Sequence, residues 1–221
     1  MIMLAISTSS SVASAALMID DAFFSKSVET ASGTHSQIIL PLADELMAAN
    51  SITPDMIDIY AVDSGPGSFT GVRIGVCIAN AMAHTYGRGI IPVSSLEALV
   101  FNAGLPCCGN VCALLDARNG NGYSSLYVDG ECRQNPSAVQ VEEFLRELPT
   151  DTLFIGSGAV QYRQVIKDVC VNPRFFDDNL NNLDARSVIK AANRAIDRRI
   201  VPLTEVTPMY LRPSQAERKL K

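Results

Sequence analysis

Basic residues are in short supply in this sequence of 221 residues: 18 lysines and arginines stand against 23 acidic residues, which gives a net charge of −5. Proteins that bind nucleic acids on their own usually present a basic surface that displaces counterions from the phosphates. The acidic balance therefore argues against unaided RNA binding. We expect any role on RNA to depend on a partner.

Long apolar runs are missing as well. The longest candidate, residues 72–83, contains Arg73 and Asn80, and it is shorter than the roughly 20 residues that span a bilayer. The N-terminus begins Met-Ile-Met-Leu without a basic segment, and its apolar run stops at Ser7, so the pattern of a secretory signal is absent. We expect a cytoplasmic protein that does not bind membranes.

Metal-ligand patterns are also lacking. His35 and His84 lie far apart in the chain, and neither belongs to a spacing such as His-Glu-x-x-His. Cys107, Cys108 and Cys112 do not form the Cys-x2-Cys pairs of structural zinc sites. The Gly-x-Ser-x-Gly elbow of serine hydrolases does not occur either. We therefore predict free thiols and no metal site.

Apolar residues are plentiful: they make up 48% of the chain, and only 19% is charged, so a substantial core can form. The length fits one large domain or two small ones. In the first half, apolar runs and turn signals predict three adjacent strands, followed by alternating helices and strands. Strands are expected at 2–7, 12–19, 22–29, 57–62 and 90–93, and helices at 36–50, 72–86 and 96–102.

The same order of elements begins again after a turn-rich segment at Gly104–Gly109. Strands are expected at 111–116, 123–128 and 153–155, and helices at 141–148, 160–169 and 185–198. This repetition predicts two linked α/β subdomains, residues 1–102 and 103–203, with the tail at about 204–221 returning to the first.

The most unusual segment is Asp63-Ser-Gly-Pro-Gly-Ser-Phe-Thr-Gly71, between a predicted strand and a predicted helix. Backbone donors at a helix N-terminus can bind an anion, so the segment is a candidate phosphate loop. It matches neither a Walker A loop nor the G-x-G-x-x-G pattern. Alternatively, the glycines allow close packing, and Ser68 or Thr70 caps the helix. The candidate loop residues are Gly65, Gly67, Ser68, Thr70 and Gly71.

The helix that follows has small residues at every fourth position, from Gly71 to Ala83. Apolar residues fill its other sides, so it should be buried nearly all round or covered by a partner. Together with the preceding helix it forms a candidate partner surface. The predicted interface residues are Ile39, Leu42, Leu46, Val72, Gly75, Ile78, Ala79, Met82 and Ala83.

Several stretches resemble the TsaB (YeaZ) family across essentially the whole chain. The glycine segment, extended through Val-Arg-Ile-Gly75, is the most specific of these. The others are Leu4-Ala-Ile-x-Thr-Ser, His35-Ser-Gln, Ala113-Leu-Leu-Asp-Ala-Arg118 and Pro208-Met-Tyr-Leu-Arg212.

The resemblance implies an actin/Hsp70-like (ASKHA) fold of two α/β subdomains with mixed sheets. It also implies a noncatalytic scaffold or activator in threonylcarbamoyl transfer to the adenosine adjacent to the anticodon of tRNAs that read codons beginning with A. The implied partners are a TsaD-type paralogue, which is the catalyst, and a TsaE-type ATPase. Helices 36–50 and 70–87 would form the heterodimer or a homodimer, and tRNA would be contacted through the complex.

One position departs from the family pattern: Ser7 stands where many relatives of this fold have an aspartate that holds metal and phosphates. We therefore expect no cofactor on this chain alone, while ATP or ADP at the interface of the complex stays open. The alternative is an ASKHA-type ATPase or small-molecule kinase that uses the Gly65–Gly71 loop. A glycoprotease-like peptidase, an older label of the wider family, has no metal-ligand set in this sequence.

Overall fold

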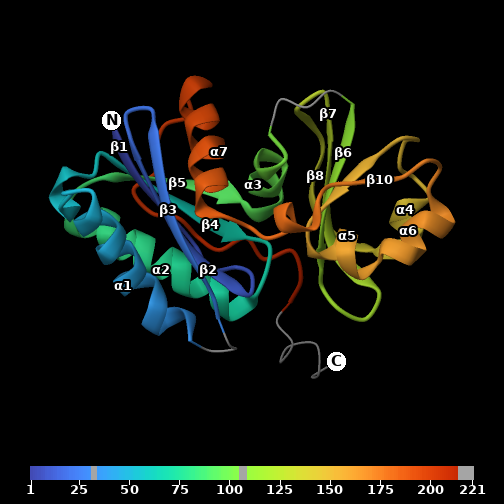
Figure 1. Ribbon diagram of the computed structural model, residues 1–221, viewed down its shortest axis with the longest axis horizontal. Helices are drawn as coiled ribbons and strands as arrows, with labels where there is room; N and C mark the ends of the chain where they lie inside the picture. Colours follow the sequence, from blue (N-terminus) through green and yellow to red (C-terminus); the bar gives the residue numbers. More distant parts are fainter. Residues whose placement is uncertain (31–33, 105–108, 214–221) are drawn as a thin grey trace. The chain divides into compact units, whose positions relative to one another are not determined.

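The computed structural model describes residues 1–30, 34–104 and 109–213, and the chain forms two compact units. The first unit contains Met1–Ala98 and Leu183–Met209, and the second contains Leu99–Asn182 and, from the described part of the tail, residues 210–213. Each unit is built on one five-stranded sheet (Figure 1). This is the α/β architecture with mixed sheets that the sequence predicts.

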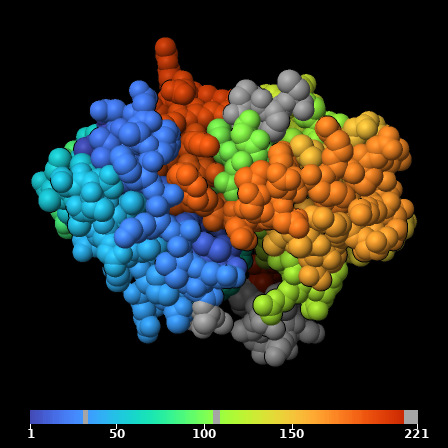
Figure 2. Space-filling model, viewed as in Figure 1, coloured from blue at the N-terminus to red at the C-terminus, as the bar shows by residue number. Residues whose placement is uncertain are grey.

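The sheet of the first unit has the order β3-β2-β1-β4-β5. Its strands are β1 (Ile2–Ser7), β2 (Val12–Ile19), β3 (Ala22–Glu29), β4 (Ile59–Gly65) and β5 (Gly89–Ser94). The first three are antiparallel neighbours, whereas β1, β4 and β5 run parallel. Strands β1 and β2 are apolar and buried on both faces because helices cover both sides of the sheet. The edge strand β3 lies at the molecular surface, where it exposes both polar side chains and the large apolar Phe23, Phe24 and Val28 (Figure 2).

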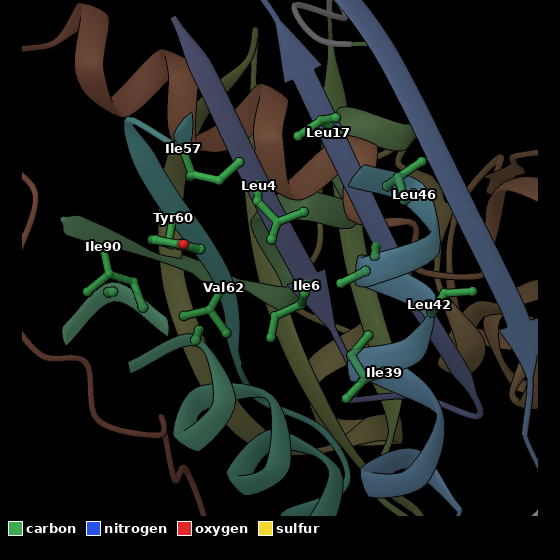
Figure 3. Packing of buried hydrophobic residues seen from close by; sticks show 14 of the residues in the cluster. Leu4, Ile6, Leu17, Ile39, Leu42, Leu46, Ile57, Tyr60, Val62 and Ile90 are labelled. Atoms are coloured by element: carbon green, nitrogen blue, oxygen red, sulfur yellow. The ribbon is translucent and has the colours of Figure 1, made fainter. Parts of the chain in front are cut away.

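Helices α1 (His35–Ala49) and α2 (Phe69–Thr85) pack on one face of this sheet. Figure 3 shows Ile39 of α1 beside Ile6 of β1, within the main hydrophobic cluster of the unit. Because side chains alternate along a strand, Leu4 and Ile6 point to these helices and Met3 and Ala5 point the other way.

Helix α7 (Ala185–Asp197) packs against β1, β2 and β4 of the first unit. The Ala185 amide donates to Ser14 Oγ at 3.0 Å, and Asn193 Nδ2 lies 2.9 Å from Met18 Sδ. The expected boundary, which placed residues 183–203 in the second subdomain, is therefore corrected. The remaining face of the first sheet needs an apolar cover, and α7 provides it with Val188, Ala191 and Ala192.

The sheet of the second unit has the order β10-β9-β6-β7-β8. Its strands are β6 (Asn110–Asp116), β7 (Asn121–Val128), β8 (Glu131–Gln140), β9 (Leu153–Ile155) and β10 (Arg174–Phe175). Helices α4 (Val141–Leu145), α5 (Ser157–Gln161) and α6 (Arg163–Val169) complete the layer, and the short α3 (Ser95–Asn102) leads from the first unit into the second. Phe154 is fully buried in the core of this unit.

The elements of the second unit differ from the prediction in places. Strand β8 is an edge strand rich in polar residues, so the apolar pattern did not indicate it. The helix expected at 160–169 is two short helices, α5 and α6, which meet at Tyr162. No helix among the described residues has the length and apolar character that a membrane crossing requires.

Candidate functional site

The glycine segment connects β4 to α2 and begins at Gly65, whose φ of +103° lies in a region that favours glycine. Ser68 is the N-cap of α2, and its Oγ accepts a hydrogen bond from the Gly71 amide at 3.2 Å. This cap is one of the two that the sequence predicts. Thr70 lies within the first turn of the helix and is exposed.

Gly67 and Gly71 pack directly against the backbone at the end of β1. A Cβ atom at Gly67 would lie 2.6 Å from the Ser9 carbonyl oxygen, and one at Gly71 would lie 2.0 Å from the Thr8 carbonyl oxygen. The Ser68 amide donates to the Ser9 carbonyl at 2.8 Å, and Thr8 Oγ1 donates to the Gly71 carbonyl at 2.7 Å. Close packing therefore accounts for both glycines, and phosphate binding by this loop stays a prediction.

A fully buried carboxylate, Asp63, lies at the end of β4 beneath this junction. Its Oδ2 accepts from Ser7 Oγ at 2.7 Å and also from Ser9 Oγ. Its Oδ1 accepts from Ser95 Oγ at 2.5 Å and from the Gly65 amide at 3.1 Å. Burial raises the pKa of Asp63, and the hydrogen bonds from the three serines and the amide lower it by less. We call Asp63, Ser7, Ser9 and Ser95 the serine cage.

The serine cage explains what Ser7 does at the position where many relatives of this fold have an aspartate. Ser7 contributes a hydroxyl donor to Asp63, where an aspartate would bring a second carboxylate within hydrogen-bond distance of the first. Two buried carboxylates at that separation repel unless a proton or a cation is shared between them. The sequence had indicated Ser7 as unusual but had not indicated Asp63 as its partner. In the structure, Ser7 ends β1, and Asp63 lies near the end of β4, the parallel neighbour of β1.

The predicted partner-interface residues mostly face the core of their own unit, so that part of the prediction is corrected. Ile78 and Met82 are the two that remain partly exposed. The small-residue stripe of α2 lies against β1 and β4, with Gly75 close to the Thr8 side chain. The buried ones are Ile39, Leu42, Leu46, Val72, Gly75, Ala79 and Ala83.

The outer sides of α1 and α2 instead form an exposed apolar depression of about 620 Å³, which we call the α1–α2 groove. Leu40 and Tyr86 stand at its surface with 45% and 38% of their area exposed, which is high for large apolar side chains. The groove is lined by Leu40, Pro41, Ala43, Asp44, Met47, Pro54, Ile78, Ala81, Met82, Thr85 and Tyr86.

The described residues contain no group of three or more histidine, cysteine or acidic side chains that could hold a metal ion. Cys77, Cys112, Cys132 and Cys170 are free thiols, as expected, whereas Cys107 and Cys108 lie outside the described residues. Burial raises the pKa of the Cys112 thiol, so it is not a reactive thiolate.

Comparison with known proteins places these features in a family context. Residues 28–220 match the family model described as TsaD, tRNA N6-adenosine threonylcarbamoyltransferase. The chain is 30% identical to the tRNA threonylcarbamoyladenosine biosynthesis protein TsaB of Bacillus subtilis, over 99% of this chain and 97% of that one. The structure of YeaZ from Pseudomonas aeruginosa is 25% identical, with a TM-score of 0.80, and the match covers 95% of this chain and 99% of that chain.

A more distant likeness supports the fold alone. Component A of (R)-2-hydroxyglutaryl-CoA dehydratase from Acidaminococcus fermentans is 9% identical, with a TM-score of 0.53 over 89% of this chain and 99% of that chain. Together with the two mixed sheets, the likenesses confirm the predicted α/β actin/Hsp70-like fold.

Proposed function

The chain belongs to the TsaB (YeaZ) family, whose name places it in the biosynthesis of tRNA threonylcarbamoyladenosine, and we propose that it acts there as a noncatalytic subunit. In this proposal it scaffolds and activates a TsaD-type paralogue, which transfers the threonylcarbamoyl group to the adenosine adjacent to the anticodon. A TsaE-type ATPase and the tRNA join through that complex, in the cytoplasm.

The observation that carries the proposal is how differently the two sides of α2 are used. Its inner side and the glycine loop are occupied by contacts with Thr8, Ser9 and the core, whereas its outer side borders the α1–α2 groove. An apolar depression of this size on an exposed helix pair is typical of a protein-binding surface. We propose the α1–α2 groove as the docking site of the TsaD-type paralogue.

The sequence predicted nine residues at the partner interface. The proposal keeps two of them, Ile78 and Met82 of α2, at the contact with the partner. Both line the groove while packing partly against the core. Asp44 is the acidic group in the lining, so a partner surface that is apolar with a basic residue at its rim would complement it. A second copy of this chain could not supply that base from its own groove, since none of the lining residues is basic.

Co-purification with the host's TsaD-type paralogue tests this surface. Ala81→Arg puts a long charged side chain on the exposed floor of the groove, so the complex should be lost. Ala49→Arg is the matched control, because Ala49 is also an exposed helical alanine but does not line the groove. A complex that survives Ala81→Arg as well as it survives the control would overturn the assignment. A homodimer of this chain that forms through the groove, in place of the complex with the paralogue, would also overturn the assignment.

The ATPase or kinase alternative gains no support from the glycine loop. The amide of Ser68 is engaged by the Ser9 carbonyl, the Gly71 amide by the Ser68 side chain, and position 7 provides a hydroxyl to Asp63 in place of a free carboxylate. ATP turnover by the purified chain alone, abolished by a change at Gly67 that leaves the protein folded, would favour this alternative over our proposal. ATP or ADP at the interface of the complex is compatible with either.

A further inference from the structure

In the described part of the chain, three of the four sheet edges are protected against the addition of another strand. The edge strand β5 contains Pro92, and its Ile90 exchanges backbone hydrogen bonds of 2.9 and 2.8 Å with Leu203. In the second unit, β10 has only two residues, and β8 contains Pro136 and breaks in its register with β7. Short strands, prolines, bulges and a covering segment all prevent pairing with another chain. The fourth edge, β3, has none of these devices.

Strand β3 presents a regular row of open backbone groups. It pairs with β2 over eight consecutive residues without a register shift. The amide of Thr30, directly after the strand, donates to the Ser11 carbonyl at 2.9 Å. Since bonding to a given neighbour alternates along an antiparallel strand, the even-numbered residues of β3 bond to β2. The backbone groups of the odd-numbered residues, from Phe23 to Glu29, therefore point away from the sheet, where no described strand pairs with them.

The side chains of β3 add apolar surface to this open edge. Phe23, Phe24 and Val28 have 40%, 38% and 39% of their area exposed. Lys26 is bonded to Glu45 of α1 at 2.9 Å, so its side chain lies on the α1 side of the sheet. Phe24 and Val28, two residues before and after it, share that side. An edge that combines open backbone groups with exposed apolar side chains is a template for another strand.

The residue pattern of β3 complements a second copy of itself. In an antiparallel pair centred on Ser25, the two Ser25 residues exchange backbone hydrogen bonds across a two-fold axis. Phe24 then lies opposite the aliphatic stem of the second Lys26, and Ala22 lies opposite Val28. This register brings no like charges together between residues 22 and 28. A pair centred on Lys26 would instead place two lysines opposite each other, so the pattern favours the Ser25 register.

We propose that two copies of this chain join through β3, so that their five-stranded sheets continue into each other across a two-fold axis at Ser25. The interface is one strand wide, so we expect a dissociation constant on the order of 10 µM. It uses none of the residues that line the α1–α2 groove. The inference is therefore independent of the proposed docking of a TsaD-type paralogue, and each copy keeps its groove open.

Sedimentation equilibrium of the full chain, from about 1 to about 100 µM, tests the proposal by measuring the dimer directly. Ser25→Pro removes an amide that points away from the sheet, so the dimer loses a hydrogen bond from each copy and should be at least tenfold weaker. Ser25→Ala is the matched control, because it keeps that amide and should dimerise as the natural chain does. Thermal unfolding confirms that both variants are folded.

A second variant tests the same interface through a side chain, should Ser25→Pro fail to fold. Phe24→Lys places a positive charge opposite the second Lys26, so the dimer should be at least tenfold weaker, and added salt should restore part of it. Val171→Lys is its control, because Val171 is an exposed valine of the second unit. A natural chain that stays monomeric at the highest concentration, or a dimer as tight in the two β3 variants as in their controls, would overturn the proposal.

Discussion

The junction beneath the glycine loop and the α1–α2 groove use the same helix in opposite ways. At the junction, Asp63 has four hydrogen-bond donors, and Gly67 and Gly71 are pressed against backbone carbonyls. In the groove, by contrast, large apolar side chains of α1 and α2 are left at the surface. The most distinctive sequence motif therefore maintains the fold, and the surface that suits a partner has no motif at all.

Gly71→Ala should show the largest effect on the junction. The new Cβ would lie 2.0 Å from the Thr8 carbonyl oxygen, so either β1 or α2 must shift, and we expect a loss of about 4 kcal/mol in the free energy of unfolding. Urea denaturation measures it. Gly87→Ala is the control, because nothing lies within 4 Å of its Cβ position and only the left-handed backbone costs about 1–2 kcal/mol. Equal losses in both variants would contradict close packing.

Asp63→Ala should follow, with a loss of about 3 kcal/mol, because three buried hydroxyls and the Gly65 amide lose their acceptor. Ser64→Ala removes one buried hydrogen bond at the next position, to the Val93 carbonyl, and should cost about 1 kcal/mol. Denaturation of both variants in one buffer gives the comparison. A smaller loss in Asp63→Ala than in Ser64→Ala would mean that the serine cage does not stabilise the junction.

Ser7→Asp should destabilise the protein by about 2 kcal/mol near neutral pH, because it places a second carboxylate beside Asp63 in a buried site. The loss should shrink in acidic buffer, where one carboxyl group of the pair is protonated. Denaturation at the two pH values checks this. A loss that does not depend on pH would indicate a steric cause and no charge repulsion.

The pH dependence of stability should reveal the buried carboxyl group itself. The folded pKa of Asp63 is raised above its ordinary value of 3.8, so the folded state holds this proton more tightly than the unfolded state. Protonation of Asp63 therefore adds to the free energy of unfolding in full below pH 3.8. This added stability is lost as the pH rises to the folded pKa, with a slope of about 1.4 kcal/mol per pH unit. The difference in unfolding free energy between the natural chain and Asp63→Asn should therefore change across this range. A constant difference would contradict the raised pKa.

In contrast to the junction, the groove should tolerate a substitution with little change in the free energy of unfolding. Ala81→Arg adds a side chain at an exposed position, so we expect a change in unfolding free energy within about 0.5 kcal/mol. Denaturation beside the natural chain measures it, and a large loss would mean that the groove, like the junction, is required for folding.

Sequence reasoning succeeded where the pattern is local. The apolar runs at 2–7 and 12–19 are strands with those bounds, and Ser68 caps α2 as predicted. It failed on α2 itself, since a helix that is apolar nearly all round gives no contrast between its core face and its partner face. The seven buried interface residues were misassigned for that reason.

Contacts between residues far apart in the chain could not be predicted from the sequence for a different reason. Ser7 and Asp63 are brought together by the parallel pairing of β1 with β4, and α7 reaches the first sheet only after residues Leu99–Asn182 of the second unit. Neither contact leaves a local periodicity in the sequence. No bounds were predicted for β8 because its residues are mostly polar, as an exposed edge permits.

Reconstituted tRNA modification with the host's TsaD-type paralogue and TsaE-type ATPase is the sharpest test of the proposed role. We expect that threonylcarbamoyladenosine forms with the natural chain and with Ala49→Arg, and that formation is lost with folded Ala81→Arg. Modification at the natural rate with Ala81→Arg would contradict the assignment of the α1–α2 groove as the surface through which this chain acts.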